Sequence, residues 1–226
     1  MRHYNLLLLL LVCNFTSYAI NHIAGGELYV THIIGNTYQI RLIYYYDALN
    51  YQEPPSNSPI TVAPSPPNMA EVSIYRKSNN TRVLTANLPR ISTNDIALSE
   101  YPCRATSPPY AGLQRITYQA NVILSNANFS DMQGYYAVFQ DYTRNTSVLS
   151  NISGRRGFTA YAEFPRVNTS GTPFINSNPI FSNLSTLNIC NGQTINLDFS
   201  ASDADGDQLL YSLVDLYDAL SIPRNP

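Results

Sequence analysis

The chain has 226 residues, of which 44% are hydrophobic and 12% are charged, and its formal net charge is −2. The apolar share is large enough for a core, which excludes disorder caused by excess charge. With 13 basic against 15 acidic residues there is no basic surplus to neutralise phosphates, so we expect no nucleic-acid partner. Asn, Ser and Thr fill most of the polar share, and together with Val, Ile and Tyr they favour a β-rich extracellular protein.

The N-terminus has the three-part pattern of a secretory signal peptide. Arg2 precedes an apolar run that ends at Val12, and small residues follow up to Ala19. We therefore expect residues 1–19 to be removed and the mature protein to be secreted or held at the cell surface. The apolar run is shorter than the roughly 20 residues that cross a bilayer. No later stretch resembles one, so we expect no transmembrane span in the mature chain.

Short stretches with a period of two predict β-strands along the chain. The expected strands of the first region are Glu27–Ile34, Thr37–Tyr46, Glu71–Tyr75, Arg82–Leu88, Gln114–Leu124, Tyr135–Asp141 and Phe158–Phe164. In the second strand one face carries Tyr38, Ile40, Leu42 and Tyr44, and the other carries Gln39, Arg41 and Ile43. Hairpin turns are expected at Gly35-Asn36 and Asn79-Asn80, and the Pro-rich residues 50–68 are expected to be loop or sheet edge.

These strands predict an all-β fold with two units. Residues 20–166 are expected to form an antiparallel Ig-like β-sandwich. No segment longer than about ten residues has the spacing of an amphipathic helix, and short strands separated by turns are typical of such a sandwich. Residues 167–182 are rich in Asn, Ser, Thr, Gly and Pro and are interpreted as a linker. Residues 183–226 are expected to open a second, PKD-like or cadherin-like sandwich. Its predicted strands are Leu187–Cys190, Thr194–Ser200 and Gln208–Val214. About 45 residues bury too little surface to stand alone, so the chain is expected to be part of a longer protein.

An acidic motif in this second unit is the sharpest chemical signal. Asp203, Asp205 and Asp207 alternate along a loop, and Gly206 allows a tight bend. Clustered carboxylate oxygens suit Ca²⁺, which we expect these three residues to bind. The alternative is a hairpin whose Asp-Gly turn needs no metal.

No pattern in the sequence indicates an enzyme. His22 and His32 are too few and too scattered for a zinc site, and no Gly-x-Ser-x-Gly elbow supports a nucleophile. Gly25-Gly26 predicts a bulge or a positive φ before the first strand, since no helix follows to make a phosphate-binding loop. We assign no catalytic and no cofactor-binding residue.

Two further features concern tyrosine and cysteine. In Tyr44-Tyr45-Tyr46 and Tyr135-Tyr136 the period of two places at least one tyrosine of each run outward, either as ordinary strand packing or as a platform for sugars. In an oxidising compartment the two cysteines of the mature chain, Cys103 and Cys190, permit one disulfide.

Several segments, in fixed order, resemble the N-terminal region of secreted surface proteins of Bacteroidota, the gliding-motility-associated or PKD-domain proteins. They are Asn21-His22-Ile23-Ala24-Gly25-Gly26-Glu27, Gly134-Tyr135-Tyr136-Ala137-Val138-Phe139, Asn178-Pro179-Ile180-Phe181 and Ser202-Asp203-Ala204-Asp205-Gly206-Asp207. The resemblance implies export by a signal peptide and the type IX secretion system, and it brings no catalytic residue.

Together these observations predict a non-enzymatic adhesion or interaction module of a gliding-motility-associated surface protein. Its partner would be a surface, a glycan or a protein, contacted by loops that rigid sandwiches hold outward. The alternatives are a carbohydrate-binding module of a secreted hydrolase and a structural spacer domain.

Overall fold

The computed structural model describes residues 23–47, 66–96, 113–141, 157–169, 172–173, 175–182, 194, 196, 198–215 and 217. All regular structure in these residues is β, and no helix occurs among them. The strands are β1 (Ile23–Ile34), β2 (Thr37–Asp47), β3 (Met69–Arg76), β4 (Arg82–Asp95), β5 (Leu113–Ile123), β6 (Tyr135–Asp141), β7 (Phe158–Phe164), β8 (Asn168–Thr169), β9 (Thr172–Pro173), β10 (Ile180–Phe181) and β11 (Ala201–Ser202). The predicted all-β class is confirmed.

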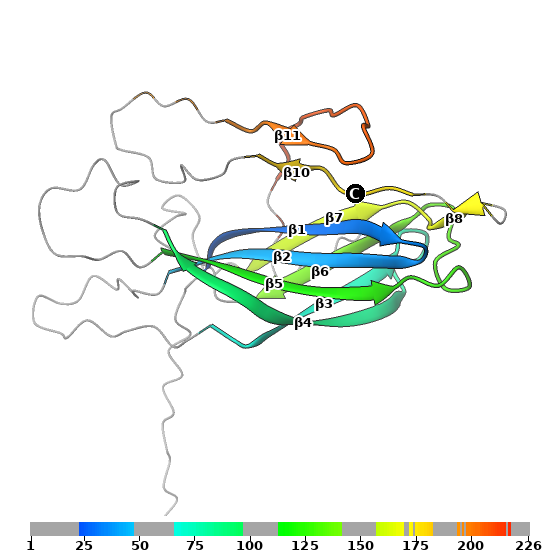
Figure 1. Cartoon of the computed structure of the whole chain (residues 1–226), viewed down its shortest axis with the longest axis horizontal. Coiled ribbons are helices and arrows are strands. Elements are labelled where there is room, and N and C mark those ends of the chain that lie inside the picture. The colour runs from blue at the N-terminus through cyan, green and yellow to red at the C-terminus, as the bar shows by residue number, and fades with distance from the viewer. Residues whose placement is uncertain are drawn as a thin grey trace, which may run out of the picture.

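Seven strands form one antiparallel sheet in the order β1-β2-β5-β4-β3-β6-β7. The sheet curls until its end strands, β1 and β7, lie side by side, so its shape is close to that of a barrel (Figure 1). Tight turns join β1 to β2 and β3 to β4, with Gly35 and Asn80 both at a φ of +56°. The two hairpins predicted from Gly35-Asn36 and Asn79-Asn80 are therefore confirmed.

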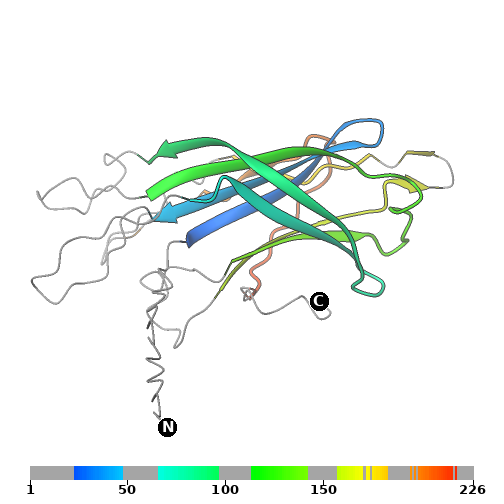
Figure 2. The same ribbon diagram turned by 90° about the horizontal axis from the view of Figure 1, so that it is seen from below.

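β4 joins the two halves of the curled sheet because its ends pair with different strands. Residues up to Pro89 pair with β3, whereas residues from Arg90 to Asp95 pair with β5. A register shift between Arg90 and Ser92 leaves Ile91 as the extra residue of a bulge, with its side chain 55% exposed. Bulges bend and twist a strand. Figure 2 shows the β3–β4 hairpin running diagonally between the two halves of the sheet.

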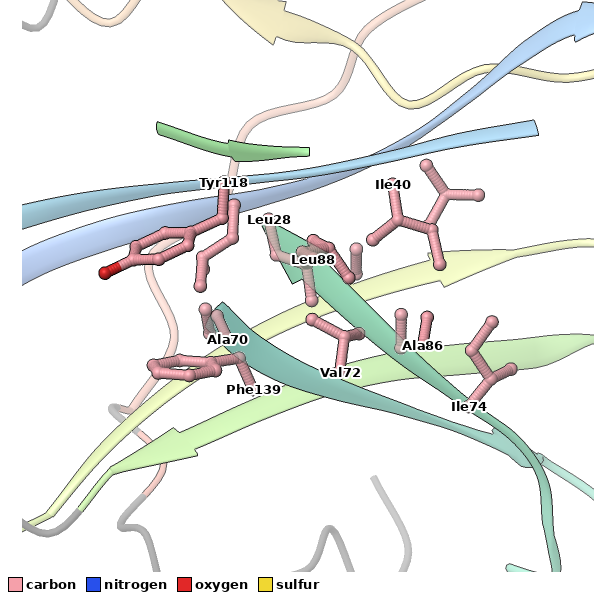
Figure 3. Close-up of a cluster of buried hydrophobic side chains, with 14 of the residues drawn as sticks. Leu28, Ile40, Ala70, Val72, Ile74, Ala86, Leu88, Tyr118 and Phe139 are labelled. Atoms are coloured by element: carbon pink, nitrogen blue, oxygen red, sulfur yellow. The ribbon is translucent and has the colours of Figure 1, made fainter. Parts of the chain in front are cut away.

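The core fills the inside of the curled sheet with side chains from alternate strand positions. Figure 3 shows side chains from both halves of the sheet meeting there: Leu28, Ile40, Ala70, Val72, Ile74, Ala86, Leu88, Tyr118 and Phe139. Each fully buried Val, Leu or Ile stabilises the fold by about 1.5–3 kcal/mol. The predicted alternation of β2 is confirmed, because Tyr38, Ile40, Leu42 and Tyr44 all belong to this core.

The two tyrosine runs divide between the faces of the sheet as the period of two predicts. Tyr44 and Tyr46 point into the core, whereas Tyr45 joins a smaller cluster on the outer face. In β6, Tyr135 belongs to the core and Tyr136 stacks against aromatic rings on the other face.

The Gly25-Gly26 pair lies where β1 approaches β7. A register shift between Ile23 and Gly25 marks a bulge, which confirms that part of the prediction. Neither glycine has a positive φ. A methyl group at Gly26 would lie 2.6 Å from the carbonyl oxygen of Ile43 and 2.9 Å from Cζ of Phe158. The lack of a side chain at Gly26 therefore leaves room for the backbone of Ile43 in β2 and for the ring of Phe158 at the start of β7.

Two strand predictions in the C-terminal region are wrong for the residues that the structure describes. No strand is formed by residues 208–214, nor by the described members of residues 194–200; only the short pair β10–β11 occurs there. The physical reason is the lack of a partner strand. Leu210 is 92% exposed and Leu213 is fully exposed, so the apolar pattern that predicted a strand is not buried by a neighbour.

Several predictions fall on residues outside the described part of the chain. These are the signal peptide (residues 1–19), Cys103 and Cys190, the strand Leu187–Cys190, and all of the Pro-rich stretch 50–68 except residues 66–68.

Candidate functional site

The acidic motif forms a compact turn held by its own side chain. Oδ1 of Asp203 accepts hydrogen bonds from the backbone N–H groups of Asp205, at 2.8 Å, and Asp207, at 3.2 Å. Gly206 has a φ of +81°, a left-handed conformation that glycine adopts without steric cost. The tight bend predicted from Gly206 is therefore present.

The other two carboxylates of the motif bind a segment well before it in sequence. We call residues 175–182 the strap. Oδ2 of Asp205 accepts the backbone N–H of Ser177 at 2.5 Å, and Oδ2 of Asp207 accepts Nδ2 of Asn176 at 2.9 Å. The acidic loop thus fixes the strap from one side.

The strap in turn lies between the two end strands of the sheet. Asn178 donates its backbone N–H to the carbonyl of Val30 and accepts the N–H of Val30 on Oδ1, at 3.0 and 2.8 Å. Its Nδ2 donates to the carbonyl oxygen of Glu163 in β7 at 2.7 Å. Ser177, only 4% exposed, accepts the N–H of His32 on Oγ. Asn178 therefore bridges β1 and β7 where these strands have no ladder of their own.

The outer face of β1 and β2 carries a buried polar cluster that the strap also covers. Tyr29 and Tyr45 both donate their hydroxyls to the carboxylate of Glu27, the second at 2.9 Å. Burial, followed by the charge of Glu27, raises the pKa of Tyr45 to about 12. Ile180 of the strap packs on this cluster, so polar and apolar contacts hold the strap together.

Hydrogen bonds to its three carboxylates hold the acidic loop in its compact turn in the absence of a metal ion. Within the described residues no group of three or more His, Cys, Asp or Glu side chains is placed to hold one. Asp203, Asp205 and Asp207 are engaged by backbone and amide N–H groups. Ca²⁺ binding by these residues stays a prediction.

Four tyrosines form a ladder across the outer face of β3, β6 and β7. The ring centroids of Tyr75 and Tyr136 lie 5.2 Å apart, those of Tyr136 and Tyr161 5.4 Å, and those of Tyr161 and Tyr217 5.3 Å. Tyr136 stacks between two neighbours and is only 2% exposed. The contact between Tyr161 and Tyr217 packs the C-terminal segment against β7. Because the tyrosine rings cover one another's faces, the ladder is poorly suited to receive a sugar ring.

The longest connections between strands all begin and end at one end of the sheet. We call this end the loop rim. The last residues of β2 and β4, Asp47 and Asp95, are in register with the first residues of β5. The end of β6, Asp141, faces the start of β7 at Phe158. Across the interior, the hydroxyl of Tyr44 in β2 donates to Oδ2 of Asp141 at 3.3 Å. Residues 48–65, 97–112 and 142–156 all connect strand ends at this rim.

Ser177 and Asn178 were not predicted to be structural residues, because they lie in a polar stretch interpreted as a linker. The pair Asn178-Pro179 was a usable signal, since Asn and Pro together are typical of a fixed turn. His32, in contrast, has a local role: its Nε2 hydrogen-bonds with the carbonyl of Gly35 at 3.0 Å, and its ring packs edge-on against Tyr38.

Comparison with models of protein families, with curated proteins and with solved structures finds no match. Among the described residues, no helix has the length and apolar character needed to cross a membrane.

Proposed function

We propose that this chain is a non-enzymatic, exported interaction module of a surface protein. The supporting observation is the loop rim, where one rigid sheet brings together the strand ends that flank residues 48–65, 97–112 and 142–156. Binding residues often lie on loops that a rigid scaffold positions. The first of these segments is rich in proline, which limits the backbone freedom lost on binding.

The proposal includes the cell-surface location and the link to gliding-motility-associated proteins. Both rest on the N-terminal pattern and on the sequence resemblance. We also propose a detailed fold for the two regions. Residues 20–166 have an Ig-like arrangement, and residues 183–226 form the start of a PKD-like or cadherin-like unit. The β10–β11 pair and the ordered acidic loop support a second unit beginning there.

A calcium-stabilised junction between the two units is the proposed role of the acidic loop. Asp205 and Asp207 contact the strap, and the strap contacts β1 and β7. Ligation of the loop carboxylates by Ca²⁺ would therefore stiffen the connection between the acidic loop and the sheet.

The two alternatives differ in what should be found attached or bound. A carbohydrate-binding module of a secreted hydrolase would recognise sugars and lie beside an enzyme domain. A structural spacer would bind nothing. The self-stacked tyrosine ladder disfavours a sugar platform built from tyrosine faces.

Adhesion of coated beads tests the proposal. Beads carrying residues 20–226 are washed over glass coated with a neutral polysaccharide, beside beads whose protein has residues 51–62 and 101–110 replaced by Gly-Ser segments of equal length. We expect native beads to be retained and the replaced variant to lose retention. A control variant, Ser78→Ala, alters the opposite end of the sheet and should behave as native. Equal retention of all three kinds of bead, or none by the native protein, would contradict the proposal.

A further inference from the structure

The outer face of β2 and β5 carries four polar side chains that form one connected group. Gln39 and Arg41 of β2 stand opposite Asn121 and Gln119 of β5 in the register of the sheet. We call these four residues the amide face. Asn121 is exposed and the other three are partly exposed, and all four lie on the side of the sheet away from the core.

The hydrogen bonds within the amide face run in a consistent direction. Arg41 donates from Nε to Oε1 of Gln119 at 2.9 Å and from Nη2 to Oε1 of Gln39 at 2.8 Å. Gln39 then donates from Nε2 to Oδ1 of Asn121 at 3.4 Å. Every amide oxygen of the group is thus already an acceptor.

The groups left for a ligand are consequently donors. A guanidinium has five N–H groups, and Arg41 uses two of them here. Nε2 of Gln119 and Nδ2 of Asn121 have no acceptor among the described residues. A face that offers N–H groups is complementary to a ligand rich in acceptor oxygens.

The charge of Arg41 is also uncompensated within the described part of the chain. The ion pair found there joins Lys77 to Glu163 on the other half of the sheet, and no described carboxylate pairs with Arg41. Gln39 and Gln119 hold the guanidinium in place, which lowers the entropy lost when a planar carboxylate binds to its remaining edge.

We propose that the amide face binds an acidic polysaccharide, with a uronate carboxylate on Arg41 and sugar oxygens on the amide N–H groups. This inference rests on the proposed role as an interaction module and adds a second binding surface, on β2 and β5, to the segments at the loop rim. One cation among neutral donors suits a polymer whose charges are separated by hydroxyl groups. A nucleic acid would need several cations to neutralise successive phosphates, whereas the amide face offers one.

Calorimetric titration with polygalacturonate tests the inference, with EDTA present to prevent gelling by calcium. The fully methyl-esterified polymer has the same backbone without the charge. We expect saturable binding of the acid form, weak binding of the ester, and a loss of about tenfold or more in affinity for Arg41→Gln, as for other hydrogen bonds to charged groups. Arg41→Lys should restore only part of the affinity, because an ammonium lacks the planar fork.

Arg82→Gln is the matched control, since Arg82 is an exposed arginine at the start of β4. It should bind like the native protein, and the circular-dichroism spectra of all variants should agree. Three results would overturn the inference: equal affinity for the ester, unchanged binding by Arg41→Gln, or tighter Arg41-dependent binding of an oligonucleotide or an acidic peptide. If Arg41→Gln binds polygalacturonate like the native protein while replacement of the rim segments abolishes bead retention, the inference fails and the proposed function stands.

Discussion

Asn178 pairs with Val30 as one strand residue pairs with another, although Asn178 lies in no strand of the sheet. It accepts the N–H of Val30 on its side-chain oxygen and donates its own backbone N–H to the carbonyl of Val30. Its side-chain amide also reaches the carbonyl oxygen of Glu163 in β7. One residue therefore satisfies backbone groups on both sides of the opening between β1 and β7.

Replacing Asn178 by alanine should destabilise the protein. The change removes the side-chain oxygen that accepts from Val30 and the side-chain amide that donates to Glu163. The N–H of the fully buried Val30 is left without a partner, which costs about 1–3 kcal/mol. Urea unfolding measures the loss. Asn87→Ala on the exposed face of β4 is the matched control and should change stability by no more than about 0.5 kcal/mol. A similar stability for both variants would show that the bridge contributes nothing.

The two neighbouring glycines of β1 should respond differently to the same substitution. In Gly26→Ala the new methyl group meets a backbone oxygen at 2.6 Å and the ring of Phe158 at 2.9 Å. We expect a loss of about 1–3 kcal/mol, as for other overpacked sites. In Gly25→Ala the nearest atom is at 4.0 Å, so stability should change little. Thermal unfolding of the two variants compares them, and a larger loss for Gly25→Ala would refute the tight packing of Gly26 against Ile43 and Phe158.

Stability should fall at high pH because of the buried tyrosines. Burial is the main cause that raises the pKa values of Tyr46 and Tyr118 from 10.0 to about 12. In the unfolded chain these hydroxyls lose their protons near the ordinary value, so the unfolded state binds fewer protons between pH 10 and 12. Their contribution is complete below about pH 10 and is lost as the pH rises to about 12.

Tyrosinate absorbance and circular dichroism, followed together, test this behaviour. We expect part of the tyrosinate signal to appear only with unfolding. If all tyrosines titrate near pH 10 while the fold persists, the buried positions of Tyr46 and Tyr118 are refuted.

Calcium should raise the melting temperature if the acidic loop binds it as predicted. Bound ion favours the native state by mass action, and the loop is linked through the strap to β1 and β7. EDTA should reverse the effect, and the Asp203→Asn, Asp205→Asn, Asp207→Asn triple variant should not respond. An identical melting temperature of the native protein with calcium and with EDTA would refute the prediction.

The strands and turns that depend on residues close together in the sequence were predictable. Alternation in residues 37–46 gives both the strand and its inward face, because neighbouring side chains of a strand point to opposite sides. The turns at Gly35-Asn36 and Asn79-Asn80 follow from residues that tolerate a positive φ.

The remaining features depend on contacts between distant residues. The strand predicted to end at Leu88 continues through Pro89 to Asp95, because it gains β5 as a new partner beyond the bulge. The first strand begins at Ile23, before the glycine pair that was expected to precede it. Asn178 has the composition of a linker residue, and its role appears only when Val30 and Glu163 lie beside it. The acidic loop was predicted as a tight turn, but its contacts with Asn176 and Ser177 were not.

Size-exclusion chromatography with light scattering, on native protein mixed with polygalacturonate, would show whether this module recognises its partner and leaves it unchanged. We expect the protein to co-elute with polymer whose chain length stays the same after long incubation. Polymer that becomes shorter with time, or protein that elutes entirely separately from it, would contradict that expectation.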